Sequence, residues 1–387
     1  MSVPLTYVDP ALSIRDLDTG KVIPLRDIEN STALLKSMRM STKKKIILPN
    51  GVNLTMFYNL IQQELAPSNM SIIDLAYPHQ KPVTKIALSK NKQFIATADS
   101  FGSISTLINF EVNKTIHGHD KKINSLDFSI DNHLISCSDD KTAKFWKRSF
   151  SRPISTLQHD GPVRAAKFYP NDPDSAVTCC GKEVIFWNAR RGVIINSLQF
   201  LSEPTAIDFS SDGNLIIIGC LNGYCYLYEL AKMMYVGQFA CGRRKKKAII
   251  PKSVLSLSCG PDSIVVSTSD NRVRLYDLKD YHFVRKFLSY SSSNEETTDV
   301  SLSSDGSMVF IANKENGRAF VYPTDASTFF KKSTIVHSLK EDASSTFFGF
   351  TLGEGFVITS TLVEPSDDGE KLVLLIGDSG GRLYRVC

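Results

Sequence analysis

IHGHDKKINSLDFSIDNHLISCSDDKTAKFW, residues 116–146, is the stretch that decides the fold of this chain of 387 residues. Its segments 123–128, 133–138 and 140–146 carry apolar residues at alternate positions and are bounded by Asp, Asn, Ser or Gly. Such alternation indicates short strands. Asp and Asn side chains bond to their own backbone in tight reversals, which predicts turns between the strands.

This stretch resembles one blade of a WD-repeat protein, with a Gly-His pair at one end and a Trp at the other. In WD repeats, a His before the blade, a Ser or Thr of the second strand, the turn Asp and the Trp satisfy one another's hydrogen bonds. Buried Trp, His and Asp side chains need such partners. The resemblance assigns a structural network to His119, Ser136 or Ser138, Asp140 and Trp146.

The repeat extends along most of the chain. His79, His119 and His159 recur at a constant interval of forty residues, which a stack of equal blades requires. The expected third strands are Phe101 to Leu107, Asp140 to Trp146, Gly181 to Trp187, Asn222 to Tyr228, Asp270 to Tyr276, Asn316 to Tyr322 and Gly380 to Val386. The sequence therefore predicts an all-β fold, a seven-bladed WD-repeat β-propeller with a short N-terminal extension that contains one helix.

We expect residues 1–69 to form the extension and residues 70–387 the propeller. The apolar residues between Leu54 and Leu65 share one helical face, which predicts a helix that docks on the propeller or binds a partner. The chain ends right after the last expected third strand, so the missing fourth strand must come from elsewhere. Residues 70–77 are expected to supply this closing strand and to remove an exposed edge.

Composition favours a cytoplasmic or nuclear protein. No apolar run approaches the ~18 residues that span a bilayer, and the first residues lack the pattern of a signal peptide. The eight cysteines lack the C-x-x-C spacing of zinc or redox sites, so we expect reduced thiols, no metal and no cofactor. The formal net charge is only +5, but part of the positive charge is clustered.

The cluster is a basic run, Arg243, Arg244, Lys245, Lys246 and Lys247, which we expect in a solvated loop that binds a partner. Three functions are considered for this basic run. It resembles a nuclear import signal, and its charge also suits binding to acidic lipid headgroups. Binding to nucleic acid is less favoured, because no aromatic residues for base stacking are interleaved with the charges.

The segment Gly377-Asp378-Ser379-Gly380-Gly381 matches the active-site serine segment of trypsin-like proteases. A serine nucleophile also needs a base, an orienting carboxylate and a substrate pocket, and only eight residues follow Ser379. We therefore expect a turn between two strands here. No enzyme activity is predicted.

The order of features resembles one branch of the family, the Rab-GTPase-binding, rabphilin-like WD-repeat proteins of recycling endosomes. The resemblance rests on residues 16–25, on residues 158–170, and on the basic insertion followed by residues 265–278. It implies a non-catalytic scaffold that binds other proteins, including a small GTPase, as an adaptor in membrane trafficking on endomembranes. The alternative is a nuclear scaffold in ribosomal RNA processing or ubiquitin-ligase substrate recognition.

Overall fold

The computed structural model describes residues 13–15, 22–24, 72–147, 150–245, 248–287, 297–313, 318–324, 348–351, 358–365 and 372–386. The chain divides into two compact units, Met1–Ser68 with Asp325–Phe348, and Asn69–Thr324 with Gly349–Cys387. In the first unit, β1 (Ser13–Arg15) pairs antiparallel with β2 (Val22–Pro24).

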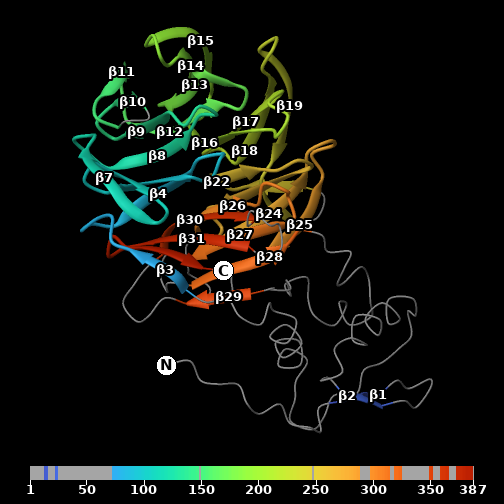
Figure 1. Cartoon of the computed structure of the whole chain (residues 1–387). Coiled ribbons are helices and arrows are strands. Elements are labelled where there is room, and N and C mark those ends of the chain that lie inside the picture. The colour runs from blue at the N-terminus through green and yellow to red at the C-terminus, as the bar shows by residue number, and fades with distance from the viewer. Residues whose placement is uncertain are drawn as a thin grey trace. The chain divides into compact units, whose positions relative to one another are not determined.

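The second unit consists mainly of four-stranded antiparallel sheets (Figure 1). The first three blades are formed by β4 (Val83–Leu88), β5 (Phe94–Asp99), β6 (Ser103–Ile108), β7 (Glu111–His117), β8 (Ile123–Phe128), β9 (Leu134–Ser138), β10 (Thr142–Trp146), β11 (Pro153–Gln158), β12 (Val163–Tyr169), β13 (Asp172–Cys180), β14 (Glu183–Asn188) and β15 (Val193–Gln199). The next three are formed by β16 (Pro204–Phe209), β17 (Leu215–Cys220), β18 (Tyr224–Glu229), β19 (Met234–Ala240), β22 (Val254–Cys259), β23 (Ser263–Thr268), β24 (Arg272–Asp277), β25 (Phe283–Phe287), β26 (Thr297–Leu302), β27 (Met308–Asn313), β28 (Arg318–Pro323) and β29 (Phe348–Thr351).

The remaining four-stranded sheet joins the two ends of this unit. It contains β30 (Ile358–Pro365), β31 (Leu372–Asp378), β32 (Leu383–Val386) and, as its outer strand, β3 (Ile72–Ala76). Leu75 lies opposite Tyr384 and Ala76 opposite Leu383 in the antiparallel register. Figure 1 shows β3, in blue, beside the red C-terminal strands.

The predicted fold class needs correction on two points. In the described part of the chain, six sheets are blades of four consecutive strands, and the remaining sheet is not a repeat of this kind because β3 precedes the first blade. The predicted count of seven blades relied on third strands alone. The last expected third strand, Gly380 to Val386, lies in the sheet that β3 completes, and this sheet does not consist of four consecutive strands. The described residues also contain no helix, and the helix expected between Leu54 and Leu65 lies outside them.

The inner strands form a closed circuit. Each of β4, β8, β12, β16, β22, β26 and β30 contacts the next, and β30 contacts β4. Apolar clusters fill the space between neighbouring blades, as where the Phe145 and Phe168 rings meet edge to face at 5.7 Å. The second strands β5 and β9 are buried along their whole length, because a sheet covers each of their two faces.

Closure by β3 can be tested at two neighbouring positions. The Ala76 side chain is 7% exposed and packs among residues such as Val83 and Leu383, whereas Leu75 is 42% exposed. We expect Ala76→Asp to lower the free energy of unfolding by about 3 kcal/mol or more, because it buries an unpaired charge. The matched variant Leu75→Asp should cost less than ~1 kcal/mol. Urea denaturation measures both, and equal losses would contradict the assigned packing of β3.

Candidate functional site

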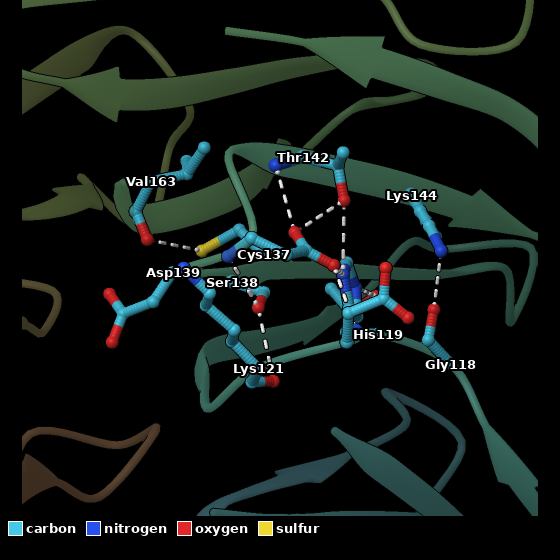
Figure 2. A network of polar contacts seen from close by, with 12 residues as sticks. Gly118, His119, Lys121, Cys137, Ser138, Asp139, Thr142, Lys144 and Val163 are labelled. Carbon is cyan, nitrogen blue, oxygen red and sulfur yellow. Dashed lines mark hydrogen bonds and ion pairs between the residues drawn. The ribbon is translucent and has the colours of Figure 1, made fainter. Parts of the chain in front are cut away.

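A hydrogen-bond network in the second blade brings the four predicted structural residues together. The Trp146 indole N–H donates to Ser136 Oγ at 2.8 Å, and Ser136 Oγ lies 2.7 Å from His119 Nε2. His119 Nδ1 lies 2.8 Å from Asp140 Oδ2. Figure 2 shows His119 and Thr142, whose hydroxyl donates to Asp140 Oδ1, and Lys144, whose ammonium donates to the Gly118 carbonyl.

The contacts fit a neutral histidine. The Ser136 hydroxyl accepts from Trp146 and has its own proton to donate to His119 Nε2, and Nδ1 then carries the proton that Asp140 accepts. Burial lowers the pKa of His119 to about 4, although the Asp140 carboxylate opposes this shift. Burial would raise the pKa of Asp140, but hydrogen bonds from Thr142 and His119 hold it below its usual value.

The first and third blades contain shorter forms of the network. His159 Nε2 and the Trp187 indole N–H both lie 2.8 Å from Thr178 Oγ1. His79 Nε2 lies 2.9 Å from Thr97 Oγ1, with Asp99 3.4 Å from the other ring nitrogen. All three histidines therefore hold the same place between a loop and a second strand.

In two other sheets the turn Asp is paired with an arginine four residues later, at or beside the third strand, which was not predicted from the sequence. Arg274 is 3% exposed, and its Nη2 donates to Asp270 at 2.6 Å. Arg382 Nε donates to Asp378 at 2.8 Å, and Tyr384 donates to the same carboxylate at 3.0 Å. The available signal was an Asp in the turn after the second strand with an Arg four residues later.

Ser379 lies in the turn between β31 and β32. The neighbouring Asp378 is fully buried and also accepts hydrogen bonds from the backbone N–H groups of Gly380 and Arg382. Its carboxylate therefore holds the turn and the third strand together, which is a structural use of the protease-like segment.

A second group that the sequence analysis missed lies on the inner strands. Lys167 of β12 lies 3.7 Å from Asp127 of β8 and 3.5 Å from Asp208 of β16. Asp208 and Asp127 raise the pKa of Lys167. The alternation of Lys and Asp at one position of successive inner strands was the available signal. These ion pairs link three neighbouring blades.

The basic run lies largely on a hairpin. β20 (Gly242–Lys245) pairs with β21 (Ala248–Pro251), so Arg243, Arg244 and Lys245 occupy a strand where a loop was expected. In the register, Arg243 lies opposite Ile250 and Arg244 opposite Ile249. Lys246 and Lys247 lie outside the described residues. This hairpin is inserted between the outer strand β19 and the inner strand β22.

The base of the hairpin is fixed to the propeller by its backbone. Cys241 N–H donates to the Gly223 carbonyl, and Lys252 N–H donates to the Cys241 carbonyl, both at 2.7 Å. Gly223 has φ near +80°, and a Cβ there would lie 2.5 Å from Lys252 N. Only glycine fits this close approach between the β17–β18 turn and the hairpin.

Two segments, residues 110–147 and 196–229, match the family model described as WD domain, G-beta repeat. These two segments are similar to WD repeats. The chain is 24% identical over 257 residues to WD repeat-containing protein 44 of Xenopus laevis, covering 64% of this chain and 27% of that protein. It is 25% identical over 171 residues to eukaryotic translation initiation factor 3 subunit I of Scheffersomyces stipitis, covering 39% of this chain and 49% of that protein.

The chain thus spans about a quarter and about half of these two relatives. Its fold is similar to the crystal structure of the Cps50 (Swd1) β-propeller domain of Myceliophteria thermophila, with a TM-score of 0.65 and 14% identity, covering 82% of this chain and 99% of that chain. Neither relative's name refers to Rab binding, so the expected rabphilin-like resemblance is not supported. In the described residues, no helix is long and apolar enough to cross a membrane, and no three His, Cys, Asp or Glu are grouped to hold a metal ion.

Replacing the central hydroxyl of the second-blade network tests its energetic weight. We expect Ser136→Ala to lower the free energy of unfolding by about 3 kcal/mol, because it leaves the buried Trp146 N–H and His119 Nε2 without partners. In a Trp146→Phe background the same change should cost less, because the indole donor is already absent. Chemical denaturation of the four proteins gives the coupling, and additive losses would contradict the network.

Acidification is expected to destabilise the folded chain through three histidines whose pKa is lowered by burial. The ordinary pKa of 6.5 is lowered to about 4 in His119 by burial, and burial also lowers the pKa of His79 and His159. The unfolded chain therefore binds protons that the folded chain does not, and stability falls as the pH drops from 6.5 toward 4. The loss for His119 alone is about 3 kcal/mol at ~1.4 kcal/mol per pH unit.

Urea denaturation at several pH values measures this effect. His119→Asn removes one titrating group, so its stability should depend less steeply on pH in this range. A slope equal to that of the wild type would contradict a neutral His119 in the folded protein.

Proposed function

We propose that this WD-repeat propeller is a non-catalytic adaptor in membrane trafficking, located in the cytoplasm and peripherally on endomembranes. WD propellers generally bind other proteins, and binding residues tend to lie on the loops of a rigid scaffold. The proposal extends this general role to one process and one compartment.

The basic hairpin β20–β21 is the observation that carries the proposal. The blade boundary before it, between β15 and β16, spans only residues 200–203, whereas residues 241–253 lie between β19 and β22. This insertion combines the run Arg243, Arg244 and Lys245 with the exposed residues Ile249 and Ile250. A cationic hairpin on a rigid ring suits acidic partners at a membrane surface.

The same run also fits the alternative role of a nuclear scaffold, in which it serves as an import signal. The two roles differ in compartment and in the proteins bound. The apolar pair on β21 favours trafficking, because recognition of an import signal depends on the basic residues.

Affinity capture from cell extract tests the proposal. Wild-type protein is expected to recover small GTPases or vesicle-coat proteins, and a variant with Arg243, Arg244 and Lys245 changed to Ser is expected to lose them. The control is Lys121→Ser with Lys122→Ser, two exposed lysines before β8, which should bind as wild type does. Surface changes of this kind usually alter stability by less than ~0.5 kcal/mol. Recovery of importins with nucleolar or ligase subunits would replace trafficking with the nuclear role.

A further inference from the structure

Exposed apolar side chains gather in the segments around the basic hairpin. Leu201, in the loop before β16, is 95% exposed. Leu221, which begins the turn between β17 and β18, is 42% exposed, and Ile249 and Ile250 of β21 are 46% and 43% exposed. Side chains of this kind on three neighbouring segments form more than a scatter of single exposed residues.

Hydrogen bonds donated by backbone N–H groups hold the three segments side by side. Leu221 N–H donates to the Glu203 carbonyl at 2.9 Å, and Asn222 N–H donates to Ser202 Oγ at 3.0 Å. These two bonds fix the Leu201 loop against one side of the β17–β18 turn. Gly223, at the other end of the turn, contacts the hairpin base through its carbonyl, which accepts from Cys241 N–H.

The hairpin brings three basic residues, Arg243, Arg244 and Lys245, into this part of the sequence. In the backbone register Arg243 lies opposite Ile250 and Arg244 opposite Ile249. Lys182, whose carbonyl accepts from the backbone of Phe200, lies beside the Leu201 loop, and Glu203 is the acidic residue within that loop. These segments contribute four basic residues, Lys182, Arg243, Arg244 and Lys245, against two acidic residues, Glu183 and Glu203, so their formal charge is positive.

The exposure of these residues favours a lipid surface over a protein partner. Protein interfaces obtain most of their affinity from Trp, Tyr and Arg anchors that fill pockets, and Leu is under-represented among them. A leucine that is almost fully exposed projects from the surface and lines no pocket. Projecting apolar side chains beside Lys and Arg are typical of segments that lie in the interface of an anionic bilayer.

We propose that Leu201, Leu221, Ile249 and Ile250, together with Arg243, Arg244 and Lys245, form a surface that binds an anionic lipid bilayer. The apolar side chains enter the headgroup region, and the basic residues lie near lipid phosphates and carboxylates. The attraction acts only at short range, because salt screens charges beyond about 8–10 Å. The inference rests on the proposed function in that it names a partner of the same hairpin.

Vesicle flotation with the full chain tests this surface. Wild-type protein is expected to float with vesicles of phosphatidylcholine and phosphatidylserine, and to remain unbound with phosphatidylcholine alone or at high salt. Changing Arg243, Arg244 and Lys245 to Ser should weaken binding about a hundredfold, at ~1 kcal/mol per basic residue. Leu201→Ser with Leu221→Ser should weaken it about tenfold or more, because the buried apolar area is lost.

The matched control is Val193→Ser with Ile194→Ser, two residues of β15 that are also about half exposed but lie on an outer strand. This variant should float as wild type does. The inference is overturned if wild-type protein does not float, if the control loses binding equally, or if the leucine variant binds as wild type does, since the site would then be purely electrostatic. As a control for correct folding, every variant should have the same thermal unfolding temperature as the wild-type protein.

Capture from membrane-free extract separates this inference from the proposed function. If the wild type recovers trafficking proteins but does not float, the adaptor role stands and the lipid surface falls. If it floats but recovers no trafficking protein, the lipid surface stands alone. Loss of a protein partner from the leucine variant of a chain that does not float would identify a protein-docking surface instead.

Discussion

The propeller depends on one pairing, that of β3 with β32. Without it, β32 would present an unpaired edge, and an exposed strand edge is a site for aggregation. Residues separated by more than three hundred positions must meet to form this sheet, as Leu75 does with Tyr384. Closing so long a loop costs conformational entropy that is offset only when the neighbouring sheets are in place. The inner-strand circuit and the β3–β32 pairing are therefore expected to form together.

Within the circuit, several sheets tie the third strand to the second strand or to the turn between them, with different residues. The tie is buried, so its polar atoms need partners. In the second blade a neutral histidine, a serine and an indole N–H do this. In the fifth blade Arg274 and Asp270 form a salt bridge with the Arg274 side chain almost fully buried. A salt bridge of this kind does not need a Trp as hydrogen-bond donor. Removing either of its partners would leave a buried charge unpaired.

These differences explain what could be predicted from the sequence. Apolar alternation and turn residues depend on local chemistry, so the strands from β8 to β10 lie within a residue or two of their expected positions. The tie in the second blade could be inferred because the Trp and His that mark a WD repeat are both present. The tie through Arg274 was missed because an Asp and an Arg four residues apart are common on any surface. The seven-bladed count was wrong because it weighed third strands alone, and strand order is set by long-range pairing.

The regular part of the propeller leaves little freedom for a specific function. Its inner strands are occupied by interblade contacts such as Lys167 with Asp127 and Asp208, and its second strands by the core. A new contact with a partner is least costly where the repeat is interrupted, because an insertion changes no strand of the ring. Gly223 illustrates the one constraint on that freedom, since it must lack a Cβ for the hairpin base to approach. Backbone hydrogen bonds thus fix the base of the hairpin, while its Ile249 and Ile250 remain exposed.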